Sequence, residues 1–206
     1  AYVSAGGMNR RQAGEDFYFL QELAKTGGVS RIDSTTVHPS ARSSDRVPFG
    51  TGATVGRHLS GAVDGSTVYH PDVYKIIGDW LSLVVNGLDR GATELLAGAG
   101  GICPQLREFL ELKRFEETWP RLQQNAPHHA GLELQFHRWF DGFKTLKLIH
   151  FLRDHQLPDS PIFDAIYRIE PSCPGDVTSD LIDDFEAQET LLEHLRRRCA
   201  ETDSER

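Results

Sequence analysis

Two adjacent acids, Glu15 and Asp16, are the side chains of this sequence best placed to do chemistry. Apolar residues recur at helical spacing from Phe17 until Gly27 and Gly28, which predicts a short helix that begins at the two acids. A carboxylate at a helix N-terminus is kept ionised by the dipole and the free amides, and it can act as a general base towards a substrate hydroxyl. Asp16 is the candidate base, although an acidic pair in this position more often serves as a helix cap.

Two arginines downstream of this helix are candidates for binding an anion. Arg42 and Arg46 lie in residues 39–56, a stretch rich in Ser, Gly, Pro and Arg that predicts an ordered loop. A guanidinium group offers forked donors that suit a diphosphate leaving group. The alternative is that Arg46 pairs with Asp45 or another acid and only fixes the loop.

The elements that must position these residues are a helix, a strand and a loop. Residues 29–37 are enriched in β-branched side chains and precede Pro39, a pattern that predicts one strand. A single strand leaves its backbone groups unpaired unless a sheet receives it. The segment therefore predicts a sheet that residues 1–58 cannot supply alone.

The order of these motifs is similar to that of a known family. Small residues at positions 4–8 precede Gly14-Glu15-Asp16 and its helix, a glycine pair follows, and the predicted strand ends in Thr36-Val37-His38-Pro39. Over residues 4–56 this arrangement resembles the closing part of the catalytic domain of family 2 glycosyltransferases, which have the GT-A fold.

The resemblance implies a role for each candidate residue. Asp16 would deprotonate an acceptor hydroxyl, which then attacks the anomeric carbon of a nucleotide-sugar with inversion, and Glu15 would orient the site or bind the acceptor. His38 would help to hold a divalent metal ion, Mn²⁺ or Mg²⁺, or the diphosphate. Imidazole is a better ligand for Mn²⁺ than for Mg²⁺. An ordinary strand-end residue before Pro39 is an equally good interpretation of His38.

The sequence departs from the family at the nucleotide site. In the family this site lies in the N-terminal half of the domain, with a metal held by an Asp-x-Asp-type motif, and the present sequence has no such half. Asp183 and Asp184 lie in a helical pattern and are not assigned to it. We therefore expect that Ala1 is not the native start, that an N-terminal nucleotide-binding segment is missing, and that the chain is inactive without it.

The rest of the sequence predicts helices. Together with the first segment, the prediction is a mainly α protein: a helical C-terminal bundle in residues 59–206, preceded by a helix-strand-loop remnant of a GT-A α/β catalytic domain in residues 1–58. Thr67 to His70 is predicted as a short extended piece. The predicted helical segments are Pro71–Leu88, Pro104–Gln123, Leu132–His155, a turn at Ile162–Tyr167, and Ser179–Ala200 with Ser179 as its cap.

The segment Leu132–His155 carries a wide apolar face with basic residues between its aromatic side chains. Packing in the core is the favoured interpretation of this pattern. Trp139 and Asp141 are minor candidates for contact with an acceptor.

Composition limits the classes of function. Residues 1–60 carry seven Lys or Arg against five Asp or Glu, whereas residues 61–206 carry 15 against 25, and an acidic body of this kind argues against nucleic acid binding. The sequence contains no apolar run long enough to span a membrane and no recognisable signal peptide. Three widely spaced cysteines indicate a reducing compartment, so we expect a cytoplasmic protein.

Two hypotheses follow. In the first, the chain is the C-terminal part of an inverting glycosyltransferase, with a nucleotide-sugar and an acceptor as partners in the intact enzyme, and its helices buttress the catalytic domain, shape the acceptor site or form a homo-oligomer. In the second, it is a non-catalytic helical interaction module that retains a transferase remnant. The partner of the strand predicted at residues 29–37 would distinguish the two.

Overall fold

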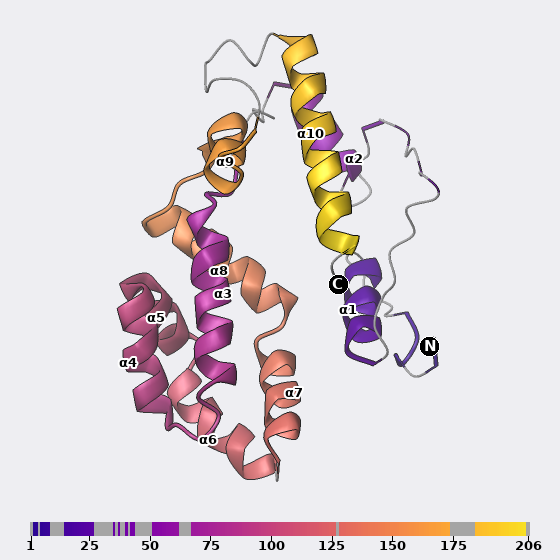
Figure 1. The fold of residues 1–206 in the computed structure, drawn as a ribbon. Coiled ribbons are helices and arrows are strands. Elements are labelled where there is room, and N and C mark those ends of the chain that lie inside the picture. Colours follow the sequence, from indigo (N-terminus) through magenta and orange to yellow (C-terminus); the bar gives the residue numbers. More distant parts are fainter. Residues whose placement is uncertain are drawn as a thin grey trace. The chain divides into compact units, whose positions relative to one another are not determined.

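The computed structural model describes residues 2–3, 5–8, 15–26, 35, 37, 40, 42–43, 51–61, 67–126, 128–173 and 184–204. The chain divides into two compact units, Ala1–Gly65 and Ser66–Arg206. Its described part is mainly helical, with ten helices and one sheet of two short strands (Figure 1). The prediction of a mainly α protein is therefore confirmed, whereas the interpretation of residues 1–58 as a GT-A remnant stays a prediction.

The first unit contains two described helices, α1 (Glu15–Thr26) and α2 (Thr51–Leu59). Helix α1 starts at the two acids, as its sequence predicts. Helix α2 corrects the prediction of a loop over residues 39–56, because residues 51–56 are helical despite Gly52 and Gly56. A Cβ atom at Gly56 would lie 3.4 Å from Cβ of Ser43, so the small residue lets the 42–43 segment approach the helix.

Most of the strand predicted at residues 29–37 lies outside the described residues. Thr35 and Val37 are described and belong to no helix or strand. The strand itself stays a prediction.

The second unit is built from helices that follow one another closely. A short antiparallel sheet pairs Thr67 with Pro161 and Val68 with Ser160, which brings the start of α3 near the start of α9. Helix α4 packs against α3, α5 and α6, and α8 packs against α3 and α5 (Figure 1). The elements are β1 (Thr67–Val68), α3 (Asp72–Val85), α4 (Ala92–Ile102), α5 (Pro104–Leu112), α6 (Phe115–Asn125), α7 (His129–Trp139), α8 (Gly142–His155), β2 (Ser160–Pro161), α9 (Ile162–Ile169) and α10 (Phe185–Ser204).

Helix α4 was not predicted, because its sequence contains Gly98, Gly100 and Gly101, and each glycine weakens a helix by about 1 kcal/mol relative to alanine. It forms because one face is apolar and buried in the core. A Cβ at Gly98 would lie 2.8 Å from Cδ2 of Leu83, so this glycine allows close contact between α4 and α3. The buried positions are Ala92, Leu95, Leu96 and Ala99.

Two predicted helices are each divided in the structure. The segment 104–123 breaks between α5 and α6, where Arg114 adopts a left-handed conformation with φ of 56°. The segment 132–155 breaks at Phe140 and Asp141, and the new helix α8 begins with its own N-cap. The turn predicted near Ile162 is a full helix, α9, of 8 residues.

The core of the second unit is aromatic. Trp80 of α3 is fully buried and meets Phe115, Phe136 and Phe140 edge-on, with ring centroids 5.3, 5.9 and 6.2 Å apart. Edge-to-face pairs of this kind add roughly 0.5–1.5 kcal/mol each beyond the area they bury. The prediction that the aromatic face of 132–155 serves packing is confirmed for Phe136 and Phe140, whereas Leu134 is exposed.

Candidate functional site

The predicted site begins at the N-terminus of α1. Glu15 is half-buried and Asp16 is exposed, and both lie in the first turn of the helix. The backbone amide of Phe17 donates a hydrogen bond of 2.8 Å to Oδ1 of Asp16. Within the described part of the chain, no basic side chain forms an ion pair with Asp16. The carboxylate is therefore held by a helix amide and remains open to solvent.

A tight turn packs against α1. The amide of Gly6 donates to the carbonyl of Val3 and that of Gly7 to the carbonyl of Tyr2, at 3.0 and 2.9 Å. Gly7 has a φ of +75°, and a Cβ there would lie 3.3 Å from the ring of Tyr2, so both conformation and space favour glycine. The Tyr2 ring in turn contacts Phe19 of α1, with centroids 5.5 Å apart.

The apolar face of α1 is only partly covered. None of its twelve residues is fully buried, and Phe17 and Leu20 are exposed. At the other end, Thr26 Oγ1 donates to the carbonyl of Glu22 at 2.9 Å, and Lys25 pairs with the Glu22 carboxylate at 3.1 Å. The C-terminal end of the helix is thus held by side-chain contacts, whereas its apolar side is only lightly packed.

The other predicted site residues are not brought to this carboxylate. Arg42 is exposed and its amide donates to the carbonyl of Ser40 at 2.9 Å, and no described contact joins it to Glu15 or Asp16. His38 and Arg46 lie outside the described residues. In the described part of the chain, no group of three or more His, Cys, Asp or Glu side chains could hold a metal ion.

Trp139 and Asp141 both have structural roles. The ring of Trp139 contacts Phe115 with centroids 5.4 Å apart, and the Lys144 ammonium lies 5.1 Å from the centre of the Trp139 ring. Asp141 caps α8 by accepting a hydrogen bond of 2.9 Å from the amide of Lys144. Burial lowers the pKa of Lys144, and the nearby Asp141 opposes that shift. These contacts give no support to an acceptor site at this helix break.

Polar contacts that sequence reasoning missed join the residue after β1 to α8, and α3 to α9. The Tyr69 hydroxyl lies 2.9 Å from Nε2 of His150, and Arg168 donates to both carboxylate oxygens of Asp72, at 3.2 and 2.6 Å. Each pair joins residues more than 80 positions apart in the chain. No local motif marks such pairs, so no sequence signal could have found them.

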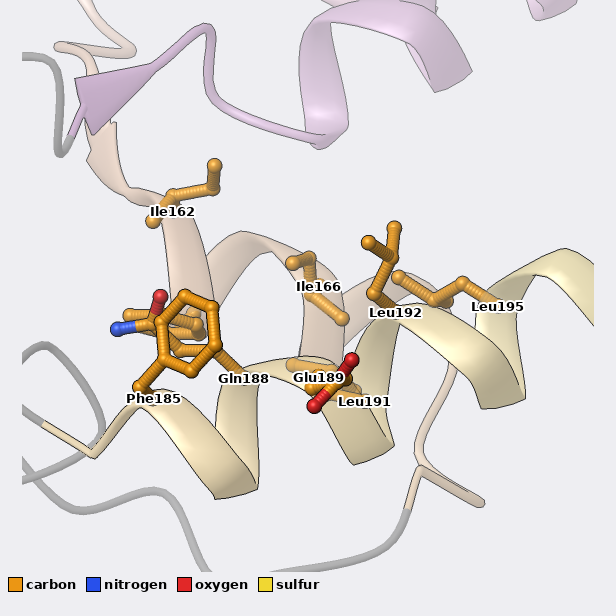
Figure 2. A pocket seen from close by; sticks show the side chains of 9 residues that line it. Ile162, Ile166, Phe185, Gln188, Glu189, Leu191, Leu192 and Leu195 are labelled. Atoms are coloured by element: carbon orange, nitrogen blue, oxygen red, sulfur yellow. The ribbon is translucent and has the colours of Figure 1, made fainter.

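One cavity of the second unit is an open, apolar groove between α9 and α10 (Figure 2). Its volume is about 340 Å³, at the lower end of the range of small-molecule pockets. Helix α9 contributes Ile162, Phe163 and Ile166. Helix α10 contributes four apolar residues, Phe185, Leu191, Leu192 and Leu195, and two polar residues, Gln188 and Glu189. We call this feature the α9–α10 groove.

The two helices of the groove run in the same direction. Figure 2 shows Ile162 near the Phe185 end of α10 and Ile166 near Leu192. Beyond them, Arg198 of α10 pairs with Glu170, which follows α9, at 3.4 Å. In this side-by-side arrangement, α9 forms one wall of the groove and one face of α10 forms the other.

Comparison of the chain with protein-family models, with curated proteins and with solved structures finds no match. Among the described residues, no helix is both long and apolar enough to cross a membrane.

Proposed function

We propose that the chain is the C-terminal part of an inverting glycosyltransferase, which moves a sugar from a nucleotide-sugar donor to an acceptor hydroxyl, with Asp16 as general base. The observation that carries this proposal is the state of the Asp16 carboxylate. This carboxylate is exposed in the first turn of α1. Its Oδ1 accepts a hydrogen bond from the amide of Phe17, and it forms no ion pair within the described part of the chain. A general base must be ionised and within reach of the proton that it removes.

The packing of α1 supports a larger catalytic domain around it. A helix of 12 residues is marginal in water without tertiary packing, and no residue of α1 is fully buried. Its exposed Phe17 and Leu20 are apolar positions that further structure would cover. In the proposal, an N-terminal nucleotide-binding segment provides that structure and the donor site.

The remaining candidates take their roles from the same proposal. Glu15 lies beside the base and would orient the site or bind the acceptor hydroxyl. Arg42 and Arg46 would neutralise the diphosphate as it leaves, and His38 would ligate a divalent metal ion, Mn²⁺ or Mg²⁺, in the intact enzyme. The described residues do not supply the other ligands of a metal, so no step assigned to this chain depends on one.

The test begins with the DNA upstream of the Ala1 codon. If an open reading frame continues upstream, the whole protein is expressed and incubated with a panel of nucleotide-sugars and acceptors in Mn²⁺ or Mg²⁺, and release of nucleoside diphosphate is measured. Asp16→Asn should lower kcat by about 10²–10⁴-fold, because an amide keeps the shape of the side chain but cannot take the proton. Binding of the donor, measured by calorimetry, should hardly change.

The matched control is Glu22→Gln on the same helix. Glu22 pairs with Lys25 rather than standing at the N-terminus, so its loss should leave transfer unchanged. Full activity of Asp16→Asn would remove this residue as the base.

A second candidate function is that of a non-catalytic helical interaction module. The observation in its favour is the α9–α10 groove, which presents apolar side chains at the surface of the helical unit. A stop codon close upstream of Ala1, together with no nucleotide release by the chain, would favour this function over the transferase.

A further inference from the structure

Helices α5 and α8 run antiparallel, and three lysines lie where α5 ends and α8 begins. At the opposite end of this helix pair, Sγ of Cys103, just before α5, lies 3.1 Å from Oε1 of Gln156, just after α8. Further along, the rings of Phe109 and Phe151 are in contact, with centroids 5.7 Å apart. The residue that follows α5 therefore meets the first two turns of α8.

The three residues are Lys113, Lys144 and Lys147. Lys113 follows Phe109 by four positions and Lys147 precedes Phe151 by four, and residues four apart share one face of a helix. Lys144 lies about one turn before Lys147 on the same face. The contact between the two phenylalanines thus brings lysines from both segments to one place.

This cluster carries more positive charge than its surroundings neutralise. Burial lowers the pKa of Lys144, Asp141 opposes this shift, and Lys147 and Lys113 lower the pKa further. The charges that act on Lys144 are thus two ammonium groups and one carboxylate. None of the three lysines forms an ion pair within the described part of the chain. In a protein with a net charge of −8, this local excess of positive charge suits an anion from outside the chain.

Aromatic rings hold two of the ammonium groups in place. Nζ of Lys144 lies 5.1 Å from the centre of the Trp139 ring, and Nζ of Lys113 lies 5.1 Å from the centre of the Phe109 ring. Such cation–π contacts restrict a flexible side chain before any ligand arrives, which lowers the entropic cost of binding. None of the three lysines is buried, so a ligand can reach them from solvent.

We propose that Lys113, Lys144 and Lys147 form a binding site for a small anion that carries phosphate groups, and we call it the lysine site. Lysine binds phosphate as a compact point charge, whereas a planar carboxylate is best matched by the fork of an arginine. The adjacent Arg114 is engaged by Glu117, with Nε 3.0 Å from Oε1. The acidic composition of residues 61–206 repels long polyanions, which favours a small ligand over nucleic acid.

The lysine site consists of residues of the second unit alone and does not depend on the proposed transferase activity. The probe is inorganic pyrophosphate, titrated into the full 206-residue chain in a calorimeter at neutral pH and low salt. We expect a dissociation constant of about 0.01–1 mM. Added NaCl should weaken binding, because exposed charge pairs are screened. Citrate, whose charge comes from carboxylates alone, should bind at least about fivefold more weakly.

Single substitutions test whether the lysines carry the binding. Lys113→Gln and Lys144→Gln should each weaken pyrophosphate binding at least about fivefold, because each removes one close positive charge. Lys144→Arg keeps the charge and should bind within about threefold of the original chain. Circular dichroism checks that each variant keeps its helix content.

The matched control is Lys75→Gln. Lys75 is exposed on α3 and also has no ion pair within the described residues, but it is not among the groups that shift the pKa of Lys144. Its loss should leave the binding of pyrophosphate unchanged.

Asp141→Asn tests the lysine site in the opposite direction. This substitution removes the carboxylate that acts on Lys144 but keeps a good N-cap for α8. Pyrophosphate should therefore bind up to about fivefold more tightly to the variant than to the original chain.

Tryptophan fluorescence reports binding at the lysine site itself. Trp80 and Trp119 are fully buried, whereas Trp139 is partly exposed and lies beside Lys144. An anion that draws the Lys144 ammonium group off the ring should change the emission of Trp139. Trp139→Phe should lose this change while calorimetry still detects binding.

Four results would each overturn the proposal. The first is that pyrophosphate does not bind at concentrations up to about 10 mM. The second is that Lys113→Gln and Lys144→Gln leave the affinity unchanged, and the third is that Lys75→Gln lowers the affinity as much as they do. The fourth is that citrate binds as tightly as pyrophosphate, which would make the site one for carboxylates.

Discussion

Gly87 lies directly against the backbone of Leu83: a Cβ atom at position 87 would stand 2.8 Å from the Leu83 carbonyl oxygen. The same Cβ would also lie 3.0 Å from Cδ of Arg90 and 3.2 Å from Cδ2 of Leu95, so the turn after α3 has room only for glycine. Gly87→Ala should lower the free energy of unfolding by roughly 1–3 kcal/mol, because the backbone must move to admit the methyl group. Urea denaturation followed by circular dichroism measures this change.

Gly78 supplies the matched control, because it is an exposed glycine within α3 whose Cβ would meet nothing within 4 Å. Gly78→Ala should raise the free energy of unfolding by about 0.5–1 kcal/mol through helix propensity alone. Equal effects of the two substitutions would contradict the close approach seen at Gly87.

The cap of α8 gives a second prediction. Asp141→Ala removes the acceptor of the Lys144 amide and should cost about 0.5–2 kcal/mol of stability. Asp141→Asn keeps a good N-cap, so its stability should be close to that of the original chain. Thermal unfolding of the two variants and the original chain, followed by circular dichroism, measures both effects. If the asparagine variant were as unstable as the alanine variant, the charge of Asp141 rather than its cap would be what matters.

The fold could be predicted in outline but not in its breaks. Periodicity located most helices, whereas α4 escaped because three of its eleven residues are glycines and only burial against Leu83 and the core compensates for them. The break at Arg114 has no local signal, since arginine is not a residue that favours a left-handed conformation. Tertiary packing determines both the formation of α4 and the break at Arg114. Such packing depends on residues far apart in the chain, so a short stretch of sequence does not reveal it.

The site shows the same division. Glu15 and Asp16 could be placed at a helix start from sequence, because capping and apolar spacing are local properties. The contacts that depend on distant segments, such as Tyr69 with His150, could not be predicted. The α9–α10 groove could not be predicted either: the apolar spacing along α10 is visible in the sequence, but the sequence predicts only a turn where α9 lies, and a groove needs both walls.

The Tyr69–His150 hydrogen bond gives a third prediction. Tyr69→Phe removes a hydroxyl that lies 2.9 Å from Nε2 of His150, at a partly buried site, and should cost about 0.5–1.5 kcal/mol of stability. Tyr74→Phe is the control, because Tyr74 is exposed on α3 and should change stability by less than about 0.5 kcal/mol. Chemical denaturation of both variants compares the two hydroxyls, and an equal loss would show that the pair with His150 adds nothing.

The last prediction concerns the thiol of Cys173, which is buried after α9. Burial raises the pKa of this thiol, and the negative charge of Glu170 raises it further. The thiolate is the reactive form of the side chain. The rate of alkylation by iodoacetamide should therefore increase at a higher pH in the native chain than in the urea-denatured chain. Mass spectrometry of the peptide that contains Cys173 follows the reaction at each pH.

Glu170→Gln separates the two causes of this shift. Removing the carboxylate charge lowers the pKa of Cys173, so at a fixed pH near 8 the variant should react faster than the original chain. The increase should be modest, because burial is the larger cause and the substitution leaves it in place. A native pH profile that coincided with the denatured one would mean that Cys173 is as accessible to water as in the unfolded chain, and it would contradict the packing of this segment.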